Sequence, residues 1–188
     1  EQALLRYFSA GKKRQLPEKN VCQFLKKATE KYPNNIAIHD DVGEKTYLEL
    51  DQCSDDLASH LLSLGVKTQD RIVIFARRNV ELIVAIIATL KAGCVFIPIA
   101  ETCPSSRVDA IRKDSGAQLT LTTVELSKQL KRNKSELIFL DRLECLKKGY
   151  RWSEPVLPSS LAYIIYKHFS LESVSKPCST PPPNYLAL

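Results

Sequence analysis

Residues 71–99 read RIVIFARRNVELIVAIIATLKAGCVFIPI, and this stretch decides the fold class. Residues 71–76 have the apolar centre of a buried strand, and Asn79 is suited to cap the helix that follows. The interior of that helix, residues 82–90, is apolar nearly all round, as in a buried helix. Residues 94–99 predict a second buried strand. Strand, helix and strand in succession are typical of an α/β domain with a parallel sheet.

The same alternation continues on both sides of this stretch. Before it, we expect a helix over residues 20–31, short strands over 36–38 and 45–47, and an amphipathic helix that Gly65 ends. After it, we expect helices over 104–113 and 124–131, and strands over 118–122, 137–140 and 161–166. The sequence therefore predicts a doubly wound α/β fold, with a largely parallel sheet and helices on both faces. In such sheets ligands lie beyond the carboxyl ends of the strands, which indicates a place but no chemistry.

Several residues have a structural explanation at this stage. Thr46 and Glu49, three residues apart, are typical of a capping box at a helix start. Lys91 would lie in the last turn of its helix, where a cation suits the helix dipole. Gly93 would take the left-handed cap conformation, and Pro98 is expected to end the pairing of its strand.

The first helix is expected to carry one apolar face. Its members, at helical spacing within residues 20–31, are Val21, Phe24, Leu25 and Ala28. Residues 32–35, YPNN, predict the end of this helix.

Composition and charge restrict the function classes. Of 188 residues, 44% are apolar and 26% charged, which predicts one soluble globular domain. The most apolar stretch, residues 80–100, contains two charged residues, a glycine and a proline, so we expect no membrane span. The net charge is +6, but the basic residues are dispersed without interleaved aromatics. Solvated faces are therefore favoured over nucleic-acid binding.

Candidate ligands and nucleophiles form no recognisable pattern. The six cysteines are irregularly spaced with no C-x-x-C pair, which favours reduced thiols in the cytoplasm over a zinc site or disulfides. They are Cys22, Cys53, Cys94, Cys103, Cys145 and Cys178. The scattered histidines are His39, His60 and His168. The pair Asp40-Asp41, shortly before Gly43, predicts a turn rather than a cation site.

Three stretches, in order and at plausible spacing, resemble the first signatures of nonribosomal peptide synthetase adenylation domains. They are residues 45–50 (KTYLEL), 90–99 (LKAGCVFIPI) and 161–166 (LAYIIY). The connecting sequence is similar as well, so the resemblance spans about residues 4–166. It identifies the chain as the front part of a member of the adenylate-forming, AMP-binding superfamily, and implies an incomplete N-terminal portion of the adenylation fold. One position departs from the second signature: Ala100 stands where an aspartate is usual, and Glu101 follows it.

A larger departure begins at Lys167. In the family, the third signature runs into a glycine-rich phosphate loop, because residues without Cβ let backbone N–H groups approach the phosphates of ATP closely. Residues 167–188 instead read KHFSLESVSKPCSTPPPNYLAL, and Gly149 is the last glycine. We therefore expect no working phosphate loop. Methionine is absent even at position 1, so we interpret the chain as a piece of a longer protein.

These observations predict three segments. Residues 1–19 are interpreted as an interdomain linker or lead-in, residues 20–166 as the N-terminal part of an adenylation (AMP-binding) domain, and residues 167–188 as a divergent Ser/Pro-rich, disordered tail. The family's pocket, metal-binding and ribose-binding acids and mobile lysine have no matching positions. We therefore predict no catalytic, cofactor-binding or metal-binding residue in this chain.

The resemblance implies a function for the parent protein. The parent would activate an amino acid, or another carboxylic acid, with ATP and Mg to an acyl-adenylate, and pass it to a phosphopantetheine thiol. Its partners would be the remaining domains of a multidomain synthetase, carrier domains and, as a further candidate, condensation domains, with no nucleic acid and no membrane. The fragment itself would hold no cofactor and be inactive. Two alternatives stay open: a non-catalytic interaction module, or a fragment of an acyl-CoA synthetase or of a β-alanine- or aminoadipate-activating enzyme.

Overall fold

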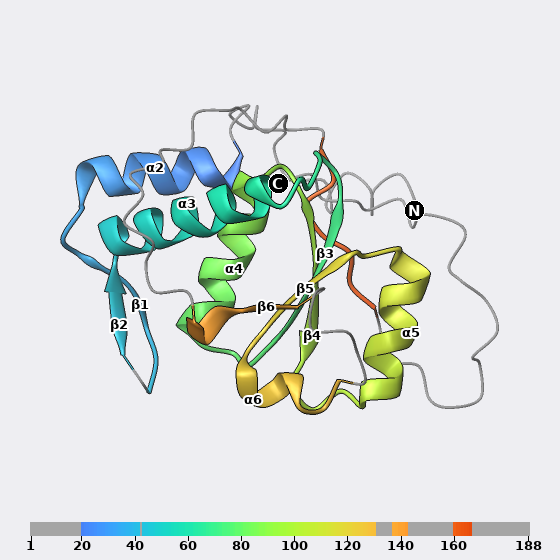
Figure 1. Cartoon of the computed structure of the whole chain (residues 1–188). Helices are drawn as coiled ribbons and strands as arrows, with labels where there is room; N and C mark the ends of the chain where they lie inside the picture. Colours follow the sequence, from blue (N-terminus) through green and yellow to red (C-terminus); the bar gives the residue numbers. More distant parts are fainter. Residues whose placement is uncertain (1–19, 42, 131–136, 143–159, 167–188) are drawn as a thin grey trace, which may run out of the picture.

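The structure, a computed structural model, describes residues 20–41, 43–130, 137–142 and 160–166 (Figure 1). Its elements are α2 (Val21–Lys31), β1 (Ile36–His39), β2 (Glu44–Thr46), α3 (Tyr47–Ser63), β3 (Arg71–Ala76), α4 (Val80–Lys91), β4 (Val95–Ala100), α5 (Ser105–Ser115), β5 (Leu119–Thr122), α6 (Val124–Ser127), β6 (Leu137–Phe139) and the 3-10 turn η2 (Leu140–Arg142). The predicted lead-in and tail lie outside the described residues.

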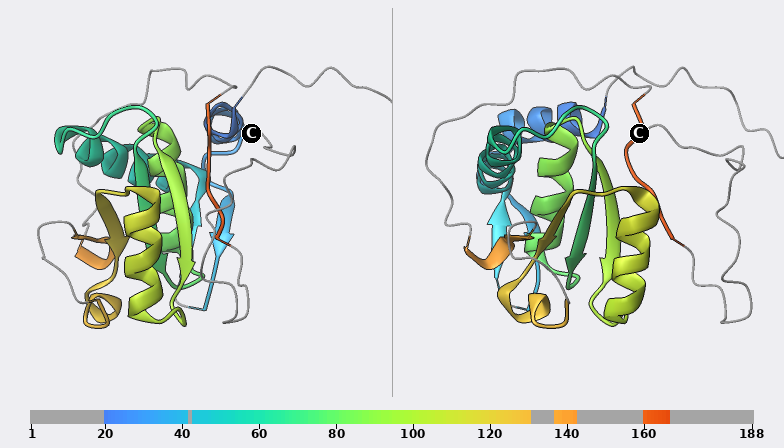
Figure 2. Two further views of the ribbon diagram at one scale, coloured as in Figure 1. Left: turned by 90° about the vertical axis from the view of Figure 1, so that its right-hand side faces the viewer. Right: turned by 45° about the vertical axis from the view of Figure 1, so that its right-hand side comes forward.

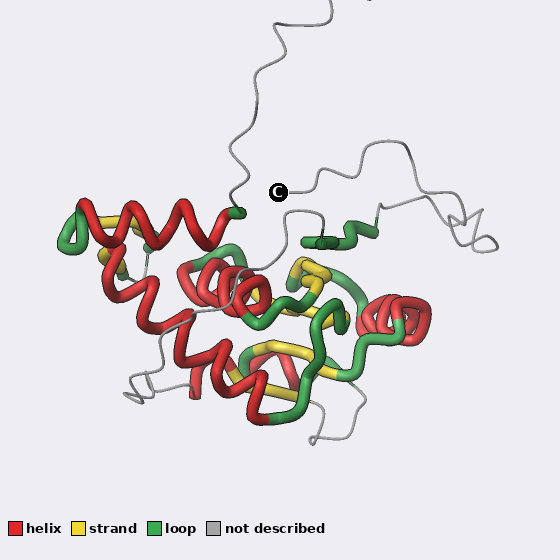
Figure 3. The backbone as a smooth tube through the Cα atoms, turned by 90° about the horizontal axis from the view of Figure 1, so that it is seen from above, coloured by secondary structure: helices red, strands yellow, loops and turns green. Residues whose placement is uncertain are grey.

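The main sheet has four parallel strands in the order β4-β3-β5-β6. Strands β1 and β2 form a separate antiparallel hairpin. Figure 2 shows α3 and α4 on one side of the main sheet and α5 on the other, and Figure 3 shows the same separation from above. The predicted doubly wound α/β fold with helices on both faces is confirmed.

Strand β3 lies at the centre of two hydrophobic cores. Ile72 and Ile74 pack with α3 and α4, whereas Val73 and Phe75 pack with α5, and all four side chains are at most 1% exposed. Side chains of a strand alternate between its faces, so a strand covered on both faces must be apolar at every position. This requirement explains why residues 72–75 show no polar–apolar alternation.

Three helix boundaries confirm the local signals. Thr46 caps α3: its Oγ1 accepts from the Glu49 N–H at 3.2 Å, and its own N–H donates to Glu49 Oε2 at 2.8 Å. The Asn79 side chain accepts from the Leu82 N–H at 3.2 Å at the start of α4. After α3, Gly65 has φ +82°, the left-handed conformation expected of a residue that ends a helix.

The buried face of α2 differs from the predicted apolar face. Cys22, Leu25 and Thr29 are buried, while Phe24 is 51% exposed. The Thr29 hydroxyl donates to the backbone oxygen of Tyr47 at 3.3 Å. The buried face of α2 therefore includes the polar residue Thr29, whose hydroxyl has a backbone acceptor, and excludes Phe24, which hydropathy alone would bury.

The bounds of three other elements differ from those predicted. Helix α6 spans only Val124–Ser127 rather than residues 124–131, and the expected strand over 45–47 ends at Thr46 because Tyr47 already begins α3. Strand β6 ends at Phe139, where η2 begins.

Helices α3 and α4 are joined by a buried ion pair. Lys91 lies in the last turn of α4, as expected, but its side chain is only 1% exposed. Its Nζ donates to Asp51 Oδ1 at 2.7 Å, to Asp55 Oδ1 at 2.6 Å and to the Asp51 backbone oxygen at 3.0 Å. Two carboxylates from α3, rather than the helix dipole alone, therefore neutralise this cation.

Removing the buried cation tests this packing. We expect Lys91→Met to lower the free energy of unfolding by about 3–5 kcal/mol, because methionine removes the buried cation that neutralises the Asp51 and Asp55 carboxylates. Urea denaturation followed by circular dichroism measures the change. Lys113→Met, at an exposed position in the last turn of α5, is the control and should change stability by less than about 0.5 kcal/mol. Equal effects of the two substitutions would contradict a structural role for Lys91.

The capping box of α3 gives a pH-dependent contribution to stability. The backbone N–H and the hydroxyl of Thr46 lower the pKa of Glu49 below its ordinary value of 4.5. A depressed folded-state pKa stabilises the protein above pH 4.5, and the stabilisation is lost as the pH falls through the folded-state value. We expect Glu49→Gln to be less stable than the unmodified chain at pH 7 and equally stable at low pH, as measured by thermal denaturation at several pH values.

Candidate functional site

The carboxyl ends of the parallel strands, where ligands of such sheets bind, carry an exposed ion-pair cluster. Arg77 follows β3; its Nε donates to Glu101 Oε2 at 2.7 Å, and its Nη2 donates to Glu125 Oε1 at 3.2 Å. The hydrogen bond to Glu101, with Glu125 nearby, raises the pKa of Arg77 above its ordinary range. Glu101, the neighbour of Ala100 in the second signature, therefore pairs with the end of the adjacent strand.

The start of α4 at the same edge is closed by a carboxylate of the chain itself. Asp40 Oδ2 accepts from the Val80 N–H at 2.8 Å, and Asp40 Oδ1 accepts from the Gly43 N–H at 2.8 Å. The second bond confirms the turn predicted at Asp40-Asp41. The first uses an N–H group that an anionic ligand would need at a helix N-terminus.

Asp141 has the same role at α6. Its two oxygens accept from the Val124 N–H at 2.9 and 3.1 Å, and the Thr123 hydroxyl accepts from the Leu126 N–H at 3.3 Å. Acidic side chains therefore already occupy both of these helix starts. Neither start matches the arrangement of free backbone donors that holds phosphate.

Residues 161–166, the third signature, lie along the outer edge of β4 (Figure 1). The predicted strand is reduced to a single parallel bridge between Phe96 and Tyr163. The Phe96 N–H donates to the Ala162 oxygen, and the Ile164 N–H donates to the Phe96 oxygen, both at 3.1 Å. This expectation of a full strand was therefore wrong.

Pro98 explains why the pairing stops. Alternate residues of a parallel strand direct their N–H and C=O groups to the same neighbour, so Pro98 faces the same side as Phe96 but has no N–H to donate. The register of β4 with β3 continues past Pro98 to Ala100. The expectation that Pro98 ends the pairing of its strand was thus wrong for the pairing of β4 with β3. Pro98 limits pairing only on the outer edge of β4.

Tyr166 ends the described segment against α5. Its hydroxyl donates to Asp114 Oδ2 at 2.6 Å. Burial, followed by the Asp114 hydrogen bond, raises the pKa of the Tyr166 phenol well above its usual range. This tyrosine therefore stays neutral at physiological pH and acts as a hydrogen-bond donor.

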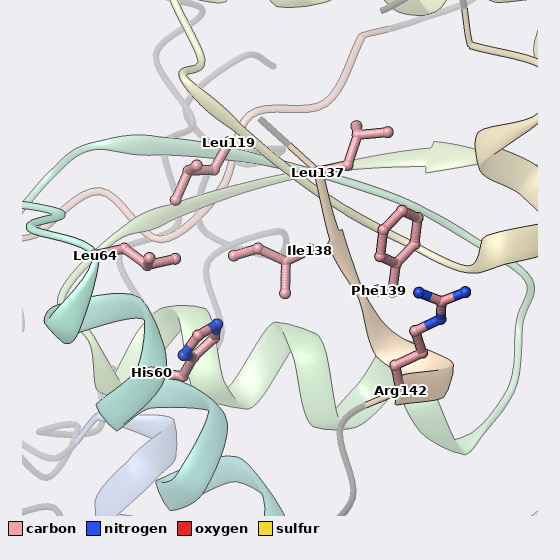
Figure 4. A pocket seen from close by; sticks show the side chains of 7 residues that line it. All are labelled: His60, Leu64, Leu119, Leu137, Ile138, Phe139 and Arg142. Atoms are coloured by element: carbon pink, nitrogen blue, oxygen red, sulfur yellow. The ribbon is translucent and has the colours of Figure 1, made fainter. Parts of the chain in front are cut away.

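An apolar groove of about 430 Å³ lies beside β5 and β6, near the end of α3 (Figure 4). Two polar side chains line it, those of His60 and Arg142, and Arg142 lies over the Phe139 ring with 5.3 Å between its Cζ and the ring centroid. The other described lining residues are apolar: Leu64, Leu119, Leu137, Ile138 and Phe139. None of the described lining residues carries a carboxylate or a thiol.

The buried thiols are poor nucleophiles. Desolvation raises the pKa of Cys22 from 9.0 to about 11 and that of Cys94 from 9.0 to about 12. Cys103 is partly buried, and its pKa is also raised by desolvation. The burial of these thiols agrees with a role as small core or loop residues. Cys145 and Cys178 lie outside the described residues.

Across the residues that the structure describes, no three His, Cys, Asp or Glu side chains gather as metal ligands. Within the same residues, no helix is both long and apolar enough to cross a membrane.

Sequence reasoning did not predict the polar partners of Arg77, Lys91 and Asp114. Arg77 could have been flagged by its place directly after a buried strand. Lys91 and Asp114 lie inside helices and gave no such signal.

The fold agrees with solved structures of nonribosomal peptide synthetases. The AMPPNP-bound form of FmoA3 matches with a TM-score of 0.77 at 21% identity, covering 89% of this chain and 18% of that chain. The N-terminal subdomain of NpsA from Klebsiella oxytoca matches with a TM-score of 0.71 at 20% identity, covering 82% of this chain and 40% of that chain. This likeness places the chain in the fold class of adenylation domains.

A family model described as "AMP-binding enzyme" matches residues 25–166, and the chain belongs to this family. Its relatives include gramicidin S synthase 2 of Brevibacillus brevis, 32% identical over 145 residues, and the phosphinothricin tripeptide synthetase PhsC of Streptomyces viridochromogenes, 33% identical over 147 residues. These alignments cover 77% and 76% of this chain. The chain spans only 3% and 14% of the length of these two relatives.

Alkylation of the thiols tests the conclusion that Cys22 and Cys94 are structural residues rather than nucleophiles. We expect Cys22 and Cys94 in the folded chain to resist iodoacetamide at pH 8, because their raised pKa values lower the thiolate fraction about 100-fold or more and burial blocks access. Both should react after unfolding in urea. Peptide mapping by mass spectrometry measures the modification. Modification of Cys94 in the folded chain at the rate seen in urea would contradict the structural assignment.

Proposed function

We propose that residues 20–166 are the N-terminal part of an adenylation domain whose parent protein activates an amino acid, or another carboxylic acid, with ATP. The observation that carries the proposal is the family match over residues 25–166, which ends at Tyr166, the last described residue of the segment along the β4 edge. The peptide synthetase relatives and the shared fold support the same conclusion. In the parent, the carboxylate of the substrate attacks the α-phosphate, pyrophosphate leaves and an acyl-adenylate forms.

The described residues do not fit a nucleotide or its metal. Asp40 and Asp141 occupy the starts of α4 and α6 at the carboxyl edge, and two glutamates neutralise Arg77. Charge on a transferring phosphoryl group needs free donors, cations or a metal for stabilisation. We therefore propose that the described residues supply no catalytic, cofactor-binding or metal-binding group and serve as scaffold for groups supplied elsewhere in the parent.

The partners and cofactors of the parent follow from the same assignment. We assign ATP and Mg to its activation step, and phosphopantetheine on a carrier domain to the acceptance of the acyl group. The neighbours in the parent would be carrier and condensation domains. The free cysteines among the described residues, two of them buried and two partly buried, favour the cytoplasm.

A second candidate is a non-catalytic interaction module, and the apolar groove beside β5 and β6 favours it. This candidate predicts that the isolated chain captures a full-length peptide synthetase in a pull-down. An unrelated domain of equal net charge is the control, since a chain with net charge +6 binds acidic proteins weakly without specificity.

ATP–pyrophosphate exchange tests the proposed function. We expect the isolated chain to give no exchange above background with any of the twenty amino acids, alongside a complete adenylation domain as positive control. A hybrid, in which residues 1–166 precede the rear part of a peptide synthetase adenylation domain from its phosphate loop onward, should regain exchange. The rear part alone should not. Exchange by the isolated chain, or a folded hybrid without activity, would count against the proposal.

A further inference from the structure

Gln69 has an unusual backbone. Its φ is +68°, and it is the only non-glycine residue with positive φ among the residues that the structure describes. A residue with a Cβ avoids this left-handed region, which glycine enters freely. The Gln69 N–H donates to the Gly93 oxygen at 2.8 Å, and a turn from Lys67 to Asp70 fixes its neighbours. A glutamine kept in a conformation that suits glycine points to a role for its side chain.

The side chain of Gln69 binds the backbone of Leu161, 92 residues further along the chain. Its Nε2 donates to the Leu161 oxygen at 3.3 Å, and the Leu161 N–H donates to Gln69 Oε1 at 3.1 Å. A primary amide presents one donor group and one acceptor side by side, as a peptide group of a neighbouring strand does. Gln69 precedes β3 in the chain, and its backbone is bonded to Gly93, shortly before β4. Its side chain thus takes the place of a strand partner for Leu161.

The rest of the segment is held at two further places. Phe96 makes two backbone hydrogen bonds with it, and its ring lies 5.7 Å from that of Tyr163, centroid to centroid. Because Pro98 offers no further N–H on this edge, the far end depends on a side chain, the Tyr166 hydroxyl bonded to Asp114. Arg71 and Ser115 also lie close to this hydroxyl.

We propose that Gln69 and Asp114 are positioning residues that clamp the two ends of residues 161–166 against the edge of β4, and so fix the position of this segment up to Tyr166. Its relevance to nucleotide binding rests on the proposed function, because in a complete adenylation domain the residues after this point would approach the phosphates. The clamp itself depends only on contacts within this chain. A single strand bridge alone would leave the segment free to open.

Hydrogen exchange in the full chain tests the clamp at Gln69. Gln69→Gly removes both side-chain bonds but relieves the left-handed backbone, so we expect unchanged or higher global stability together with exchange at the Leu161 and Ile164 amides at least about tenfold faster. Gln69→Glu keeps the acceptor for the Leu161 N–H and loses the donor, so it should restore part of the protection. Gln129→Ala, which removes an exposed glutamine after α6, is the control and should leave these amides unchanged.

The other end is tested in the same way. Tyr166→Phe and Asp114→Ala should each accelerate exchange at residues 164–166, and the double variant should be no faster than either one, because both remove the same bond. The inference would be overturned if Gln69→Gly left exchange at Ile164 within about twofold of the unmodified chain, or if the acceleration matched a loss of global stability. None of these outcomes depends on pyrophosphate exchange, so failure of the clamp and failure of the proposed function are separable.

Discussion

Burial of β3 on both faces is the constraint from which the other features follow. Strand β3 pairs with β4 on one side and β5 on the other, and it supplies side chains to the cores on both faces of the sheet. Every position from Ile72 to Phe75 must therefore be apolar. Polar groups are then confined to its ends, where Gln69 precedes the strand and Arg77 follows it. These two residues contact distant parts of the chain, Leu161 and the Glu101–Glu125 pair.

Local signals were sufficient for much of the fold. The capping box at Thr46, the cap at Asn79 and the uninterrupted apolar run of β3 each act within a few residues, and each gave a correct prediction. The features that sequence reasoning missed depend on partners far along the chain. The exposure of Phe24 follows from how α2 packs, and the charge of Lys91 is balanced by α3. For the candidate site, the family resemblance found the segment but not what holds it.

Two helix starts and the Arg77 side chain at the carboxyl edge of the sheet are satisfied by the chain's own side chains. Asp40 and Asp141 use backbone donors of α4 and α6, and Arg77 is matched by two glutamates. Groups that are already paired would have to give up those bonds to receive a ligand, at a cost that offsets the new contact. A scaffold role for this part of an AMP-binding enzyme is therefore consistent with its polar contacts as well as with its sequence.

Pro98 has a consequence for the behaviour of the chain in concentrated solution. An exposed strand edge offers a row of unpaired peptide groups on which another chain can add a strand and begin to aggregate. On the outer edge of β4, Phe96 is covered by residues 162–164, and the next position facing outward is a proline without an N–H. This edge therefore cannot template a continuous intermolecular ladder, and the residue that shortens one internal pairing also protects the protein against self-association through β4.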